Sequence, residues 1–317
     1  MSLLSALTNA ILPVLAVAAV GFLLGSRREI DVDGLGTVTI YVLTPSLVFH
    51  SLATTSIDGE TAATLVAGVV AFTLVMVVLA EFVGRALGES EPVLGALVLT
   101  STFANAGNYG IPLSQFAFGA VGRSTAILYI AVQSVLMYTV GVYLASRGED
   151  TSNLGAVREV FELPLVYAVL AAGLARVLDV VPPADSAAME TLKLTGDAAI
   201  PVMLLLLGIQ LANTDSGAAI RRVGVSNAMK LLVAPVVAAG IALALGFGDA
   251  TVARVFVLEC AMPAAVTPLI LTIEYERGVD SGLSGPEYVS TAIFASTLAS
   301  VPILTLLIAI LQSGAVV

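Results

Sequence analysis

Two asparagines lie three residues apart inside an apolar run of this chain, in the segment Thr102-Phe-Ala-Asn-Ala-Gly-Asn-Tyr-Gly-Ile-Pro-Leu113. The amides of Asn105 and Asn108 can donate hydrogen bonds to an anion without being ionised. Gly107 and Gly110 are poor helix formers, and Pro112 cannot donate the bond that the carbonyl of Asn108 expects in a helix. We therefore expect the helix to break at membrane depth, where irregular backbone is tolerated only if it is buried in protein or lines a wet cavity. The segment predicts a polar binding site inside a membrane.

A second segment, Glu259-Cys-Ala-Met-Pro-Ala-Ala-Val-Thr-Pro-Leu269, carries two prolines in a similar apolar setting. Pro263 frees the carbonyl of Glu259, and Pro268 frees that of Ala264. If both segments break at mid-membrane and cross there, they form four half-helices. The N–H ends of such half-helices carry partial positive charge and suit an anion. The candidate binding residues of the two segments are Asn105, Gly107, Asn108, Gly110, Pro112, Pro263, Thr267 and Pro268.

Composition places both segments in a protein that crosses the bilayer many times. Of 317 residues, 58% are hydrophobic and 11% charged, and the mean hydropathy is +1.02; an ordinary soluble domain has about a quarter charged residues. A single cysteine and a single histidine argue against disulfides, metal sites and serine–histidine catalysis. The net charge of −10, without a basic patch, argues against a nucleic-acid partner. Acidic loops and only two lysines against eleven arginines indicate a halophilic, archaeal source.

Ten apolar stretches are long enough to cross a bilayer, which takes roughly 20 residues each. Lys and Arg in short loops set the orientation of such helices. The loops after spans 1, 3, 5, 7 and 9 carry eight arginines, and the opposite loops carry three. We therefore expect both termini outside the cell and the 147–162 loop in the cytoplasm. The ten stretches are 5–25, 35–53, 61–87, 92–118, 123–146, 163–181, 187–212, 223–246, 251–273 and 287–312.

The ten stretches divide into two halves of five, residues 1–146 and 163–317, joined by the 147–162 loop. With five spans each, the second half enters the membrane inverted relative to the first, which is typical of secondary transporters. Proline spacing agrees with a repeat, because Pro45 and Pro112 lie 67 residues apart and so do Pro201 and Pro268. The predicted fold is an all-α membrane protein of two inverted five-helix repeats, with broken helices 4 and 9 crossing at mid-membrane.

Four motifs resemble those of the auxin efflux carrier family, the PIN-type carriers and their prokaryotic relatives. They are Asn105-Ala-Gly-Asn-Tyr-Gly-Ile-Pro-Leu113, Gln133-Ser-Val-Leu-Met-Tyr138, Thr195-Gly-Asp-Ala-Ala-Ile-Pro-Val-Met-Leu-Leu-Leu-Leu-Gly-Ile-Gln-Leu-Ala212 and Ala261-Met-Pro263. The resemblance implies a scaffold of helices 1, 2, 6 and 7, which often forms a homodimer, and a transport domain of helices 3–5 and 8–10 that moves as an elevator. It also implies that Gln133 lines the anion site and that Val48 replaces a substrate-facing serine of plant members. The lysine and acid pair that plant carriers place in span 3 is absent, so a dicarboxylate is as good a candidate substrate as auxin.

Three charged residues fall inside predicted spans, where a charge is costly and often functional. Glu259 lies one turn before Pro263 and is a candidate to couple transport to a proton or a sodium ion. Asp197 is a second coupling candidate. Its alternative role is that of a charge at the start of a helix, at the membrane interface. Lys230 is expected to reach water at the interface.

Together these features predict a secondary carrier that exports a small organic anion, such as a carboxylate or an auxin-like acid, by elevator-type alternating access. No nucleotide-binding Gly-x-x-x-x-Gly-Lys-Ser/Thr motif is present to drive it, and we expect neither a cofactor nor enzymatic activity. A sodium- or proton-coupled symporter of the bile-acid type is the main alternative. A membrane sensor that binds a metabolite without moving it is a further one.

Overall fold

The computed structural model describes residues 3–28, 30, 32–146, 164–212, 220–275 and 283–315. Every regular element in this part of the chain is a helix, and several helices contain a five-residue π-helical segment, labelled η. The predicted 147–162 loop lies outside the described residues.

In the first half, the elements are α1 Leu3–Ala6, η1 Leu7–Ile11, α2 Leu12–Arg27, α3 Val32–Val38, η2 Thr39–Leu43, α4 Thr44–Ala53, α5 Gly59–Ala86, α6 Val93–Thr102, η3 Ala106–Gly110, α7 Ile111–Leu136, η4 Met137–Gly141 and α8 Val142–Ala145. In the second half, they are α10 Pro164–Val177, α11 Ala187–Asp197, α12 Ala199–Ala212, α13 Gly224–Ala228, η5 Met229–Val233, α14 Ala234–Leu245, α15 Ala250–Cys260, α16 Thr267–Tyr275 and α17 Gly285–Ser313.

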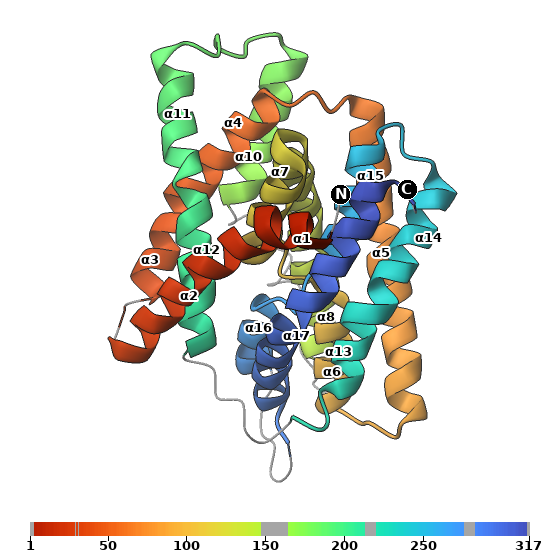
Figure 1. Ribbon diagram of the computed structural model, residues 1–317. Coiled ribbons are helices and arrows are strands. Elements are labelled where there is room, and N and C mark those ends of the chain that lie inside the picture. The colour runs from red at the N-terminus through yellow and green to blue at the C-terminus, as the bar shows by residue number, and fades with distance from the viewer. Residues whose placement is uncertain are drawn as a thin grey trace.

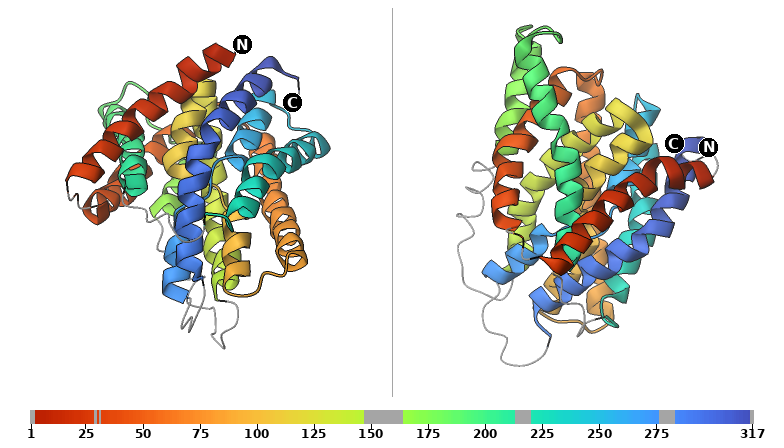
Figure 2. Two further views of the ribbon diagram at one scale, coloured as in Figure 1. Left: turned by 60° about the horizontal axis from the view of Figure 1, so that its bottom comes forward. Right: turned by 60° about the vertical axis from the view of Figure 1, so that its left-hand side comes forward.

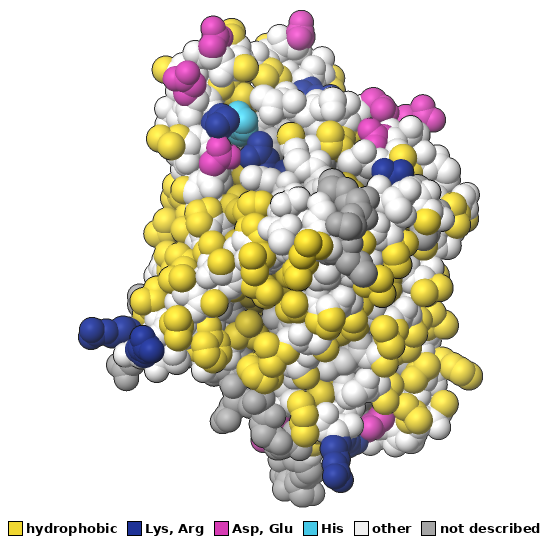
Figure 3. Space-filling view, viewed as in Figure 1, with side chains coloured by type: hydrophobic (Ala, Val, Ile, Leu, Met, Phe, Trp, Pro, Cys, Tyr) yellow, Lys and Arg dark blue, Asp and Glu magenta, His cyan; other side chains and the backbone are white. Residues whose placement is uncertain are grey.

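Seven continuous helical stretches in the described residues are long and apolar enough to span a membrane, and Val93–Thr102 and Pro164–Val177 are shorter apolar helices. Hydrophobic side chains cover the middle of the surface, and charged side chains gather toward its two ends (Figure 3). This distribution is the one expected of a protein that crosses the bilayer several times.

Four prolines inside these spans follow π-helical turns. Pro13, Pro45, Pro112 and Pro235 each lie two residues after a π segment, namely η1, η2, η3 and η5. A proline removes the N–H that the carbonyl four residues earlier would accept, and a wider turn redistributes the neighbouring bonds. The chain therefore remains helical through Pro112, which lies in the first turn of α7.

The interruption predicted within residues 102–113 lies at residues 103–105, between α6 and η3. A second interruption separates Cys260, the last residue of α15, from Thr267, the first residue of α16. The two segments lie side by side, and Ala104 and Ala264 form an isolated antiparallel β-bridge. Its backbone bonds run from Asn105 N to the Pro263 carbonyl, at 2.8 Å, and from Ala265 N to the Phe103 carbonyl, at 3.1 Å. Backbone groups that the broken helices leave unpaired are thus satisfied inside the protein, as the membrane interior requires.

A tight turn divides α7 into two helices at Gly119, where φ is 65° and ψ is −145°. This backbone conformation is open to glycine and strained for other residues. Gly122 then allows a close approach, because a Cβ there would collide with the carbonyl oxygen of Ser114. The turn agrees with the boundary predicted at 119–122 between two spans.

The helices form two groups (Figures 1 and 2). A small hydrophobic core lies between α4, α7, α10 and α12, and a larger one joins α2 and part of α12 to the helices of the second group. One group contains α2, α4, α10, α11 and α12, on the left in Figure 1, and α2 packs closely along α12. Gly208 permits this approach, since a Cβ there would collide with the Ala18 carbonyl of α2. The other group contains α5, α6, α14, α15 and α17, and α7 contacts both groups. Near the chain ends, α1 packs against α17.

Candidate functional site

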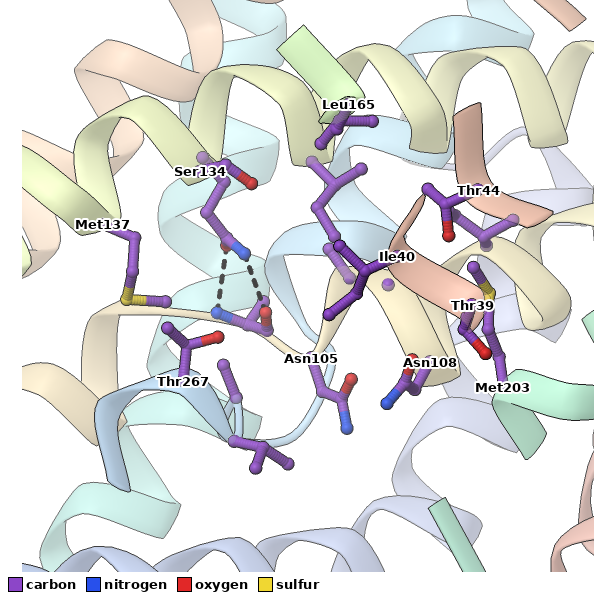
Figure 4. Close-up of a pocket in the computed structure, with 18 of the residues that line it drawn as sticks. Thr39, Ile40, Thr44, Asn105, Asn108, Ser134, Met137, Leu165, Met203 and Thr267 are labelled. Atoms are coloured by element: carbon purple, nitrogen blue, oxygen red, sulfur yellow. Dashed lines mark hydrogen bonds between the residues drawn. The ribbon is translucent and has the colours of Figure 1, made fainter. Parts of the chain in front are cut away.

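A cavity of about 290 Å³ lies where the interrupted segments meet the first helix group (Figure 4). Three sets of residues line it. The interruptions and the helix starts that follow them contribute Ala104–Gly107, Asn108, Ala265, Val266 and Thr267. The second set comes from α7, η4 and α16 and consists of Ile111, Ile130, Gln133, Ser134, Met137, Tyr138 and Ile270. The third set comes from η2 and the first helix group and consists of Thr39, Ile40, Thr44, Pro164, Leu165, Met203 and Gln210. Pro164 is the first residue of α10, so the cavity reaches toward the membrane face to which the 147–163 segment connects.

Asn105 is the polar side chain most firmly built into this cavity. Its backbone carbonyl accepts a bond from Gly110 N at 2.9 Å, and its N–H is bound to Pro263, so the residue is held from both sides. The side chain is only 4% exposed, and its Nδ2 has no hydrogen-bond partner among the described residues. The amides of Asn105 and Asn108 lie near one another in the cavity (Figure 4). A buried amide N–H without a partner is costly, so Asn105 Nδ2 is a donor ready for a ligand.

Gln133 supports this arrangement through the backbone. Its Oε1 accepts a bond from Ala104 N at 3.0 Å and its Nε2 donates to the Ala104 carbonyl at 2.8 Å, the dashed lines of Figure 4. Both functional atoms of this buried amide are therefore engaged with the peptide groups of the residue before Asn105. Gln133 lines the cavity, and its geometry suits positioning of Asn105 better than direct contact with an anion.

Two further residues, neither of them predicted for the site, hold the interruptions. Ser296 Oγ on α17 accepts a bond from Ala264 N at 3.1 Å, in the second interruption. Lys230 on η5 donates from Nζ to the carbonyl of Thr102, at 3.0 Å, and lies 5.5 Å from the ring centroid of Phe72. Lys230 is fully buried, which corrects the expectation that it reaches water at the interface. In the sequence, the feature that could have placed Lys230 at the site was its charge inside an apolar span, because such charges more often serve function than packing.

The other predicted binding residues lie at different places. Gly107, Asn108 and Thr267 line the cavity. Gly110, Pro112, Pro263 and Pro268 belong to the interrupted segments but are not among the lining residues, and Val48 is fully buried in the core of the first helix group.

Glu259 and Asp197, the two coupling candidates, lie apart from each other and are not among the lining residues. Glu259 is fully buried, and its Oε1 lies 2.5 Å from Ser114 Oγ. Its carboxyl packs against Gly110, where a Cβ would collide with it. Asp197 forms ion pairs with Arg123, at 2.8 Å, and with Lys193, at 3.2 Å, and its side chain is 40% exposed.

None of the lining residues that the structure describes carries a charge. The cavity instead offers amides, hydroxyls and the interrupted backbone, beside apolar surface from Ile40, Met203 and Leu165 (Figure 4). Such a surface can bind a small polar or anionic molecule by neutral donors, with an apolar wall for its carbon skeleton. In the described residues we find no group of three His, Cys, Asp or Glu side chains that could hold a metal ion.

Comparisons with known proteins identify the family of the chain. A protein-family model described as a membrane transport protein matches residues 6–156 and 153–308. An "Uncharacterized transporter" of Methanothermobacter thermautotrophicus is 28% identical over 297 residues, covering 92% of this chain and 94% of the relative. A "Putative malonate transporter" of Rhizobium meliloti is 24% identical over 322 residues, covering 98% and 97%. The chain therefore belongs to the membrane transport protein family, which includes the auxin efflux carriers, and is a multi-pass membrane transporter and not an enzyme.

Proposed function

We propose that this transporter carries a small organic anion, such as a carboxylate, by alternating access at the cavity between its two helix groups. The observation that carries the proposal is the buried amide of Asn105, a lining residue of the cavity whose Nδ2 has no hydrogen-bond partner in the described residues. Burial without a partner disfavours the empty site, and a bound carboxylate oxygen would accept this bond.

The size and polarity of the cavity support a small metabolite. Its volume of about 290 Å³ lies at the lower end of the range for ligand pockets, roughly 300–1,000 Å³. Neutral donors at the start of η3 add to the positive end of that helix, which favours an anion. The relative named for malonate supports a dicarboxylate, although an auxin-like acid also fits the apolar wall.

The proposed mechanism assigns the first helix group to a fixed scaffold and the second to a moving transport domain. We interpret the chain as ten spans in two inverted halves, in which α6 with η3 and α15 with α16 are the broken, crossing helices 4 and 9. The two ranges matched by the family model meet near residues 153–156, close to the predicted boundary between the halves. Relative movement of the two groups would expose the cavity first to one side and then to the other.

In the proposed orientation, both termini face outside and the cavity opens toward the cytoplasm, because its residue Pro164 adjoins the loop predicted to be cytoplasmic. Contacts of α7 with the first helix group would close the other side. The pairs are Arg123 with Asp197, at 2.8 Å, and Ser124 Oγ with the Ser51 carbonyl, at 3.3 Å. The proposed scaffold is also the expected face of a homodimer.

Flux would be driven by the electrochemical potential or by a coupled ion. A negative interior favours anion export by about 2.3 kcal/mol per charge per 100 mV. Glu259 is the candidate for binding a proton or sodium, since it is a buried acid beside the crossing. Dependence of uptake on sodium would favour a symporter of the bile-acid type.

Asn105→Ala tests the proposal directly, with Asn227→Ala as a matched control because Asn227 is a half-buried asparagine that does not line the cavity. We expect Asn105→Ala to weaken malonate binding about tenfold or more in the purified protein, and to slow malonate flux in proteoliposomes, while the control behaves as wild type. Equal malonate affinity in wild type and Asn105→Ala would refute the site. Binding without flux would favour a sensor.

A further inference from the structure

Two buried charged side chains, Lys230 and Glu259, lie beside the meeting point of the interrupted helices but outside the set of residues that line the cavity. Each acts at the end of a half-helix. Lys230 binds the carbonyl of Thr102, the last residue of α6, and Glu259 is the last but one residue of α15.

The C-terminal ends of α6 and α15 have side chains of opposite charge beside them. A helix C-terminus carries partial negative charge and is stabilised by a cation. Lys230 provides this cation at the end of α6. At the end of α15 the chain instead places an acid, whose ionised form adds negative charge where the helix is already negative.

The neighbours of Glu259 come from several elements. Ser114 on α7 binds Oε1, while Oε2 has no hydrogen-bond partner in the described residues. Lys230 on η5 acts on Glu259 through space, and no ion pair joins the two among the described residues. The remaining titratable neighbours, Tyr129 on α7 and Cys260 on α15, are ordinarily neutral.

The charges near the cavity therefore have two states. With Glu259 ionised, Lys230 and Glu259 sum to zero; with Glu259 protonated, they leave one positive charge. A bound carboxylate brings negative charge into a region of low dielectric, where uncompensated charge is costly. Only the protonated state of Glu259 leaves Lys230 free to balance the anion.

We infer that Glu259 is a proton-binding site, and that an anion enters the cavity together with one proton, which Glu259 takes up from solution. This inference rests on the proposed anion site. The proton forms an O–H bond on the carboxyl, the anion is bound unchanged, and no electron is transferred. The proton on Glu259 thus offsets one negative charge of the bound anion, while the charge of Lys230 does not change.

The surroundings of Glu259 fit a proton better than a metal cation. A hard cation takes about six oxygen ligands, whereas the only hydrogen-bonding group that the structure shows at this carboxyl is the Ser114 hydroxyl. The carboxyl is also closely packed against Gly110. A proton needs only one oxygen atom, and Oε2 is unoccupied by other hydrogen bonds within the described chain.

Linkage gives the expected pH dependence. While Glu259 is ionised in the free protein and protonated in the complex, the anion affinity falls about tenfold for each unit of pH rise. At pH values low enough that Glu259 is already protonated in the free protein, the anion affinity no longer changes with pH. Ser114→Ala removes a hydrogen bond that favours the ionised carboxylate, so it shifts this limit to higher pH.

The experiment adds potassium malonate to the purified protein in weakly buffered, sodium-free solution, with a pH-indicator dye and parallel calorimetry. Wild type is expected to take up about one proton per bound malonate. Glu259→Gln is expected to bind malonate with no uptake and no pH dependence, and Lys230→Met to lose about tenfold or more in affinity, which Lys230→Arg restores. Ser101→Ala is the matched control for Ser114→Ala, because Ser101 is buried in α6 and its hydroxyl has no partner among the described residues.

Malonate binding without proton uptake in wild type overturns this inference and leaves the anion site standing. Uptake that persists in Glu259→Gln also overturns it, since the proton then resides on malonate. If Glu259→Gln does not fold, an unshifted pH limit in Ser114→Ala, relative to Ser101→Ala, is sufficient to reject it. Absence of malonate binding at any pH refutes the proposed function and this inference with it.

Discussion

Replacing Gln133 with leucine tests whether the cavity depends on a single side chain that holds the backbone. Gln133 is 5% exposed and makes two hydrogen bonds with Ala104, of 3.0 and 2.8 Å. Leucine has a similar size but no polar atom, so Gln133→Leu leaves the buried Ala104 N–H unpaired, while the Ala104 carbonyl keeps its hydrogen bond from Ala106 N at 2.8 Å. One unpaired buried group costs about 1–3 kcal/mol, which predicts a loss of about 1–3 kcal/mol in stability.

The same substitution should reduce anion binding, because Ala104 immediately precedes Asn105 and carries the β-bridge to Ala264. We expect malonate affinity to fall at least tenfold, which corresponds to about 1.4 kcal/mol of the lost interaction energy. Calorimetry measures the affinity, and the midpoint of thermal unfolding in detergent ranks the stability.

Gln312→Leu is the matched control for this prediction. Gln312 also binds one backbone carbonyl, that of Ala117 at 2.9 Å, but it is only half-buried and does not line the cavity. We expect a smaller loss of stability and unchanged malonate affinity. If Gln133→Leu matches wild type in both measurements, the positioning role of Gln133 is refuted.

Three more substitutions test neighbouring parts of the structure. Gly110→Ala places a methyl group against the Glu259 carboxyl, so we expect about 1–3 kcal/mol of destabilisation and a changed pH profile of malonate flux. An unchanged pH profile would show that the contact with Gly110 does not affect the role of Glu259. Asp197→Asn breaks a partly exposed ion pair with Arg123 worth up to about 1 kcal/mol, so flux should change by no more than about fivefold and its pH profile not at all; a shifted profile would restore Asp197 as a coupling residue. Gly119→Ala strains the turn in α7 by about 1–2 kcal/mol, and a thermal midpoint equal to that of wild type would contradict the positive φ observed there.

Local sequence was sufficient to identify the membrane class and the two irregular segments. Hydropathy over about twenty residues identifies spans because the bilayer core is an apolar solvent, and paired amides and glycines within a span mark backbone that cannot remain an ordinary helix. Asn105, Asn108 and Thr267 were predicted for one site on this basis, and all three line the same cavity.

Local rules predicted an interruption within residues 102–113 but did not determine its place in that segment. Pro112 lies within a helical turn, since the π segment η3 absorbs its missing N–H, and the interruption is at residues 103–105. The expectation that Lys230 reaches water was wrong for a related reason. Snorkelling is the usual solution for an isolated lysine near a helix end, and nothing in the local sequence indicates the Thr102 carbonyl that binds it.

By itself the sequence determined that the chain is a bundle of membrane helices, that two of them are interrupted, and that amides lie at the interruptions. These properties depend on residues a few positions apart, which is the range over which hydropathy and backbone preference act. The tertiary structure alone decided that Ala104 pairs with Ala264, that Gln133 is used by the backbone, and that Glu259 lies against Gly110, where it is not among the residues that line the cavity. Such contacts join residues up to 160 positions apart, and they form because a broken helix inside the bilayer must find its hydrogen-bond partners in other helices.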